Sequence, residues 1–88
     1  MIKCTVEMFG NSSGTLSVEL KDGAGLADLI AALRRQFPAL MVGVIDETEN
    51  GLMDGYAFDI NGRFYVGDEE ARLQDGDYVG LVGLVVGG

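Results

Sequence analysis

The sequence predicts an α+β fold, with a mixed sheet of about four to five strands and one main helix packed across it. Three observations support this prediction: two alternating apolar segments open the chain, a segment with helical apolar spacing follows, and further strand-like segments are separated by turn dipeptides. At 88 residues the chain forms one domain, which would bury about 60 to 65% of the surface that its unfolded form exposes.

The first two segments predict a β-hairpin. Residues 2 to 9 alternate between apolar and polar side chains, which is typical of a strand with one buried face. Leu16, Val18 and Leu20 alternate in the same way and predict a second strand. Between the two, Asn11-Ser12-Ser13-Gly14 has the composition of a turn. We therefore expect the strands to be joined by a rather long loop.

A helix is predicted after the break at Asp22-Gly23-Ala24-Gly25. Apolar residues then recur at three-and-four spacing, namely Leu26, Leu29, Ile30, Leu33 and Phe37. This spacing produces an apolar stripe, which we expect to cover the apolar face of the hairpin. Pro38 should end the helix, and Arg34 and Arg35 near its C-terminal end complement the helix dipole.

The second half of the chain predicts further strands. Residues 39 to 55 carry a weak pattern, so we expect a loop there with room for one short strand. Residues 56 to 60 and 63 to 66 predict two strands joined at Asn61-Gly62, because Asn-Gly suits the positive φ angles of a two-residue hairpin turn. Asp75-Gly76-Asp77 marks a further turn.

The last strand has a different composition from the others. Residues 79 to 86 are apolar or glycine at every position, which predicts a central strand that is buried on both faces and runs into an exposed end. A central last strand beside the first, with one helix across the sheet, is the β-grasp arrangement. We expect the β-grasp domain to cover residues 1–82 and an extended, flexible C-terminal tail to cover residues 83–88.

Charge and composition exclude several classes of partner. The formal charge of −8, with only six Lys and Arg residues, opposes nucleic-acid binding because that binding depends on cationic side chains. No apolar stretch approaches the length of a membrane span, and the N-terminus lacks the layout of a signal peptide. We therefore expect a cytoplasmic protein with no membrane partner. The acidity would suit a basic partner surface, or it could simply serve solubility.

Catalytic and metal-binding groups are scarce. The chain has no histidine, a single cysteine and no phosphate loop of the GxxxxGK[ST] kind, so an independent enzyme is improbable and we expect no bound cofactor. Cys4 alternates inward with apolar neighbours, which predicts a core residue and not a nucleophile. Asp46, Glu47 and Glu49 could offer oxygens to a cation, but they lack the twelve-residue calcium-loop pattern.

The chain ends in Leu84-Val85-Val86-Gly87-Gly88. An apolar strand has no folding reason to end in two glycines, although with 14 glycines in 88 residues a terminal pair arises by chance about once in 40 sequences. Without side chains, the two glycines could thread a narrow channel and bring the Gly88 carboxylate close to another enzyme's ATP. Residues 83 to 88 would reach about 20 Å when extended. The alternative is a frayed end.

Three motifs together resemble the MoaD/ThiS family of ubiquitin-like sulfur carriers. Asn61-Gly62, the run Leu73-Gln74-Asp75-Gly76-Asp77-Tyr78-Val79 and the terminal Val85-Val86-Gly87-Gly88 match the family's NG, L-x-D-G-D-x-V and V-x-G-G in type and spacing. The resemblance implies a ubiquitin-like β-grasp fold. It also implies that a ubiquitin-activating-type enzyme adenylates Gly88 with ATP, after which the terminus becomes a thiocarboxylate.

The resemblance also implies a role for the tail and a set of partners. The tail would enter a partner's active site with Gly83, Leu84, Val85, Val86, Gly87 and Gly88. The length favours the MoaD branch, in which the chain is the non-catalytic small subunit of molybdopterin synthase and donates sulfur for the molybdenum or tungsten cofactor. The large subunit then holds the active site.

Other readings of the same features remain open. The chain could carry sulfur for thiamine, cysteine or tRNA thiolation, or it could be a ubiquitin-like modifier conjugated to lysines through Gly88. It could also be a binding module of this fold with an incidental diglycine. Two features depart from the family pattern: Gly83 and Leu84 stand where prolines are common, and residues 41 to 55 are longer and more acidic than expected.

Overall fold

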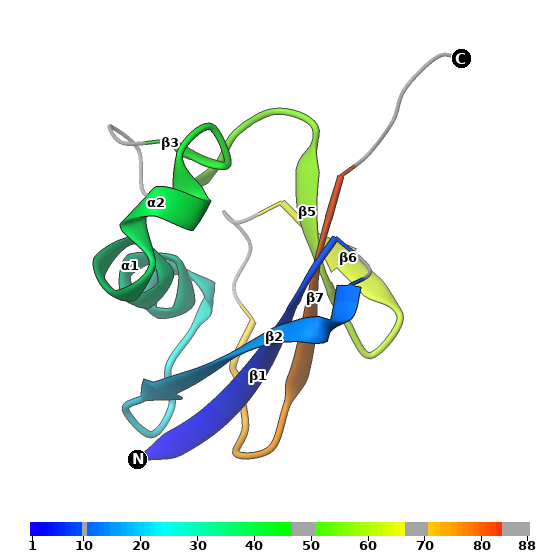
Figure 1. Ribbon diagram of the computed structural model, residues 1–88. Coiled ribbons are helices and arrows are strands. Elements are labelled where there is room, and N and C mark those ends of the chain that lie inside the picture. Colours follow the sequence, from blue (N-terminus) through cyan, green and yellow to red (C-terminus); the bar gives the residue numbers. More distant parts are fainter. Residues whose placement is uncertain (10, 47–50, 67–70, 84–88) are drawn as a thin grey trace.

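The computed structural model describes residues 1–9, 11–46, 51–66 and 71–83 and confirms the α+β fold (Figure 1). Its elements, in chain order, are β1 (Ile2–Met8), β2 (Asn11–Leu20), α1 (Leu26–Gln36), α2 (Pro38–Met41), β3 (Ile45–Asp46), β4 (Gly51–Leu52), β5 (Tyr56–Ile60), β6 (Arg63–Tyr65) and β7 (Tyr78–Gly83).

The main sheet has five strands in the order β2-β1-β7-β5-β6. The last strand therefore lies centrally beside the first, as predicted, and these two are parallel, whereas the other pairs in this sheet are antiparallel. Val79 of β7 pairs with Val6 on one side and with Ile60 on the other. A mixed five-stranded sheet with one main helix is the β-grasp fold.

The core lies between α1 and one face of the sheet (Figure 1). Leu29, Ile30 and Leu33 of the helix are fully buried, together with Phe58 and Leu81 of the sheet. Removing this apolar surface from water is the main force that holds the helix on the sheet. The apolar spacing in the sequence thus predicted correctly which face of α1 is buried against the sheet.

Backbone N–H groups at both ends of α1 form hydrogen bonds with nearby residues of the chain. The backbone N–H of Gly25 donates to Oδ2 of Asp28 at 3.0 Å, and the N–H of Phe37 donates to the carbonyl of Leu33 at 2.9 Å. Pro38 ends α1 as predicted, but it also begins α2, because proline suits the first position of a helix. A four-residue helix is too short to produce a periodic apolar pattern, so residues 39 to 55 gave no signal for it.

The first hairpin differs from the prediction at its turn. Asn11-Ser12-Ser13-Gly14 was expected to form a loop, but it belongs to β2. Met8 pairs with Asn11 and Val6 with Leu16, so residues 12 to 15 lie opposite Glu7 alone in an irregular bulge. The connection between β1 and β2 is therefore shorter than the predicted loop, and it begins at Phe9, whose φ is 52°. Because β2 is an edge strand, its polar residues do not prevent strand pairing.

The prediction that the last strand is buried on both faces was wrong. Val79 and Leu81 of β7 are fully buried, whereas Tyr78 is 49% exposed. Gly80 and Val82 are half-buried. The reason is that α1 covers only one face of the sheet, and no other described helix covers the opposite face. We call that opposite side the open face.

A second, two-stranded sheet pairs β3 with β4 through Ile45 and Leu52. It lies beside the helices, and Leu52 packs against the core. None of the described helices is long and apolar enough to cross a membrane.

Candidate functional site

The exit of the predicted tail lies at the end of β7. Gly83 is the last residue of this strand, is exposed, and pairs with Tyr56 of β5. On the other side of β7, the N–H of Phe9 donates to the carbonyl of Leu81 at 2.7 Å. The rings of Phe9 and Tyr56 lie 5.8 Å apart at an interplanar angle of 57°. An aromatic pair therefore lies beside the last described residues of β7.

Of the predicted site residues, only Gly83 lies in the part that the structure describes. It still belongs to the sheet, although the tail was predicted to begin there. A side chain at Gly83 would meet no atom within 4 Å, so the space around this residue does not require glycine. The other predicted site residues, Leu84, Val85, Val86, Gly87 and Gly88, lie outside the described residues.

The open face is polar along the first half of β7. Gly80 of β7 pairs with Glu7 of β1 on one side and with Asp59 of β5 on the other. Together with Tyr78 and the Asn61-Gly62 turn they line a hollow of about 290 Å³, which lies toward the start of β7 and away from Gly83. A Cβ added to Gly80 would lie 3.6 Å from the Cβ of Asp59, so the missing side chain makes room between the two carboxylates.

The phenol of Tyr78 is held beside one of these carboxylates. Partial loss of solvent, followed by its hydrogen bond with Glu7 and the negative charge of that residue, raises the pKa of Tyr78 above its ordinary value of 10.0. The phenol is therefore protonated at neutral pH and serves as a donor. Phe64, which is 58% exposed, pairs with Asp59 and extends the open face toward β6.

The sequence indicated this open face only in part. The alternation of residues 2 to 9 predicted one uncovered face for the first strand, with Glu7 on it, but the continuous apolar composition of residues 79 to 86 suggested burial on both sides. Gly80 was a second signal, because a glycine inside a strand often marks a close approach to another molecule.

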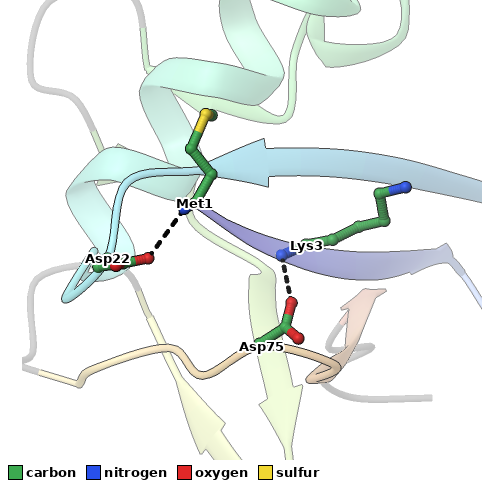
Figure 2. Close-up of polar contacts among 4 residues, drawn as sticks. All are labelled: Met1, Lys3, Asp22 and Asp75. Atoms are coloured by element: carbon green, nitrogen blue, oxygen red, sulfur yellow. Dashed lines mark hydrogen bonds and ion pairs between the residues drawn. The ribbon is translucent and has the colours of Figure 1, made fainter.

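The Leu73–Val79 motif places β7 beside β1. The N–H of Gln74 donates to Oδ2 of Asp77 at 2.8 Å, and the N–H of Lys3 donates to Oδ1 of Asp75 at 2.9 Å (Figure 2). The N–H of Gly76 in turn donates a hydrogen bond to the carbonyl oxygen of Lys3 at 2.8 Å. The motif therefore has a structural role, which is to fix the start of the strand that leads to the tail.

A second contact ties the chain near the same end of β1. The ammonium group of Met1 lies 3.2 Å from Oδ1 of Asp22, in the turn that leads to α1 (Figure 2). Both groups are largely exposed, so this ion pair contributes little to stability.

Cys4 is a core residue, as predicted. It is fully buried, and its Sγ lies 3.7 Å from the carbonyl oxygen of Gln74. Burial, and then the charges of Asp77 and Asp75, raise the pKa of the Cys4 thiol above 9.0. A thiol with a raised pKa is mostly protonated at neutral pH and is a poor nucleophile.

No metal centre is found within the described ranges, where no three His, Cys, Asp or Glu residues are grouped to hold an ion. Asp46 lies in β3, whereas Glu47 and Glu49 lie outside the described residues. At the end of α1, Arg35 is exposed and Arg34 is half-buried.

The fold, with its central last strand, is that of the ubiquitin-like sulfur carriers and modifiers, small proteins that are generally non-catalytic. The model of the ThiS family matches residues 6–88. Since this match covers nearly the whole sequence, the chain belongs to the ThiS family. A search of curated proteins finds no match to the sequence.

Solved structures with this fold come from several archaea. The chain is similar to a putative molybdopterin converting factor, subunit 1, from Pyrococcus furiosus, with 27% identity, a TM-score of 0.69 and coverage of 97% of this chain and 100% of the other. It is also similar to the small archaeal modifier protein 1 from Methanosarcina acetivorans, with 25% identity, a TM-score of 0.68 and coverage of 100% and 98%.

SAMP1 from Haloferax volcanii has the same fold, with 24% identity, a TM-score of 0.73 and coverage of 98% of this chain and 99% of the other. All three comparisons span both chains almost completely. The resemblance to the MoaD/ThiS family that the motifs predicted is therefore confirmed.

Proposed function

We propose that this protein is a sulfur carrier that is adenylated and thiocarboxylated at Gly88 and donates sulfur in molybdopterin biosynthesis. The observation that carries the proposal is the ThiS family match, which runs through the terminal glycine. The similarity to a putative molybdopterin converting factor, subunit 1, supports this branch.

The chemistry that we propose uses only the terminal carboxylate of this chain. An oxygen of the Gly88 carboxylate attacks the α-phosphorus of ATP and pyrophosphate leaves, which gives an acyl adenylate. A hydrosulfide equivalent from a sulfur donor then displaces AMP, which gives the thiocarboxylate. ATP is bound by the activating enzyme, and this chain holds no cofactor of its own. Because activation needs ATP, we assign the process to the cytoplasm.

The catalytic groups for these steps would come from the partner enzymes. The chain has no histidine, and its one thiol, at Cys4, is buried with a raised pKa. We therefore propose that the protein is a co-substrate of the adenylating enzyme. In the same scheme it is the non-catalytic small subunit that supplies sulfur to the large subunit of molybdopterin synthase.

The open face supports contact with these partners. It runs along β7, the strand that precedes the predicted tail, and combines the carboxylates of Glu7 and Asp59 with the exposed ring of Phe64. Apolar contact would supply affinity, and the carboxylates would attract basic side chains of the partner. A partner held on this face would receive the residues that follow Gly83.

Intact-mass measurement tests the proposal. The purified protein is incubated with its adenylating enzyme, ATP and a sulfur donor, and it should gain the mass that corresponds to replacing one oxygen by sulfur. A variant that lacks Gly88 is the control and should gain none. If the complete mixture leaves the mass of the intact protein unchanged, the sulfur-carrier function is wrong.

The branch is tested separately. Thiocarboxylated protein, mixed with the large subunit of molybdopterin synthase and its sulfur-free precursor, should yield molybdopterin. If the thiocarboxylate forms but no molybdopterin appears, the sulfur goes to another acceptor. A thiamine-, cysteine- or tRNA-thiolating enzyme then takes the place of the large subunit in the assay.

The modifier proteins among the similar structures favour a second candidate function, conjugation to lysines through Gly88. Arg72 is the last Lys or Arg in the chain, so trypsin would leave residues 73 to 88 attached to a modified lysine. Mass spectrometry of cell extracts should search for this longer remnant. Its absence from cells that express the protein would count against conjugation.

A further inference from the structure

A second cavity lies at the other end of the sheet from Gly83. Its volume is about 400 Å³, and it lies where β5 turns into β6 and where the chain enters β7. The register places it there, because Ile60 at the end of β5 pairs with Val79, whereas Tyr56 at its start pairs with Gly83. This cavity is therefore separate from the tail exit, and it borders the hollow on the open face, because Asn61 lines both.

Two arginines line this cavity. Arg63 comes from β6 and Arg72 from the segment before β7, and they are two of the six Lys and Arg residues in a chain with a net charge of −8. The amide side chains of Asn61 and Gln74 also line it. Hydrogen-bond donors are thus gathered here although the protein as a whole is acidic.

Both arginines are exposed, and the structure holds the side chain of Arg63 and the backbone of Arg72. The guanidinium carbon of Arg63 lies 5.3 Å from the centre of the Tyr65 ring, a cation–π contact that limits its rotation. Arg72 forms a β-bridge with Gly25, and next to it the N–H of Leu73 donates to the carbonyl of Ala24 at 2.8 Å. The backbone of Arg72 is therefore fixed against the start of α1.

The carboxylate of Asp77 also lines the cavity, and it accepts a backbone hydrogen bond. Oδ2 of Asp77 accepts the N–H of Gln74 at 2.8 Å and thereby closes the turn before β7. Within the described part of the chain, no ion pair joins Arg63 or Arg72 to a carboxylate.

We propose that this cavity binds the phosphate group of a small molecule. A guanidinium group donates two parallel hydrogen bonds to a phosphate, and two such groups outweigh the one carboxylate in the lining, that of Asp77, so the cavity keeps a positive charge for a phosphate monoester of about −1.5 to −2 at neutral pH. The amides of Asn61 and Gln74 add neutral donors. The volume lies within the range of small-molecule sites. This inference is independent of the sulfur-carrier function.

The test is a titration of isotope-labelled protein with inorganic phosphate, followed by NMR at constant ionic strength. Saturable chemical-shift changes should cluster at residues 60 to 65 and 71 to 77. Arg63→Gln and Arg72→Gln should each weaken binding by about tenfold or more, because each removes a charged hydrogen bond. Arg35→Gln is the matched control: it removes the same charge from an exposed site near the end of α1 and should leave the affinity unchanged.

The full chain is used throughout, and well-dispersed spectra establish that each variant is folded. Parallel titrations with AMP and with a sugar phosphate show which carrier of the phosphate fits best, and tighter binding of either would support the proposal. Shifts that do not saturate, equal weakening by Arg35→Gln, or equally tight binding of acetate would overturn it.

Discussion

At the residue scale, Gly76 and Cys4 both have structural roles. Gly76 lies at φ 87° in the turn before β7, where a residue with a Cβ is strained. Cys4 fills core volume and keeps its proton because it is buried beside Asp75 and Asp77. Sequence alone predicted both roles, since the Asp-Gly-Asp turn and the alternation around Cys4 are local patterns.

Replacing Gly76 by alanine should lower the free energy of unfolding by about 1–2 kcal/mol, the cost of left-handed backbone for a residue with a Cβ. Gly83→Ala is the matched control. Gly83 has no positive φ, and a side chain there would meet nothing, so this change should cost much less. Urea denaturation measures both variants. Equal losses would show that the strain at Gly76 is not the cause.

The pH dependence of stability should reveal the buried thiol. Because the folded pKa of Cys4 lies above its ordinary value of 9.0, the folded state keeps a proton that the unfolded state has lost at alkaline pH. The contribution of Cys4 is therefore fully present below pH 9.0 and is lost as the pH rises from there through the folded pKa. The free energy of unfolding should fall over that range.

Cys4→Ala provides the comparison for this effect. The difference in stability between the native protein and this variant should shrink as the pH rises above 9.0, whereas the contribution of Tyr78 is common to both and cancels. A difference that stays constant with pH would contradict the buried, protonated thiol.

At the scale of elements, the periodic segments were predicted correctly and the irregular ones were not. The apolar spacing of α1 and the Asn-Gly turn between β5 and β6 are strong local signals. The bulge in β2 is set by its register with β1, which the composition of the turn does not show, and α2 has only four residues, too few for a periodic pattern. The exposure of β7 depends on how many layers the fold has, so its apolar composition was misleading.

The packing of α1 gives a direct test at this scale. Leu33→Ala should lower the free energy of unfolding by about 2–5 kcal/mol, because Leu33 is fully buried and its removal leaves a cavity. Leu40→Ala makes the same chemical change at a residue that is 51% exposed, and it should cost less than about 0.5 kcal/mol. Similar losses in thermal unfolding would contradict the assigned core.

The open face makes a second prediction for an element. Glu7→Lys reverses one of the carboxylates beside Gly80, so it should raise the KM of the adenylating enzyme for this protein by about tenfold or more. Asp22→Lys changes the net charge equally, at an exposed turn before α1, and should leave KM nearly unchanged. If both variants raise KM alike, overall charge and not the open face governs recognition.

At the scale of the whole molecule, the sheet holds its first and last strands side by side and directs the end of β7 away from the helix layer (Figure 1). The terminal motif and the family resemblance were visible in the sequence. The make-up of the open face was not, because Glu7, Asp59 and Gly80 are far apart in the chain and meet only through strand register.

The most direct test of the sulfur-carrier function is the intact mass of the protein after activation. With the adenylating enzyme, ATP and a sulfur donor, the product should carry sulfur in place of one oxygen of the Gly88 carboxylate. The variant without Gly88 should unfold at the same temperature and gain no sulfur. An unchanged mass for the intact protein, or sulfur added equally to the shortened variant, would contradict this function.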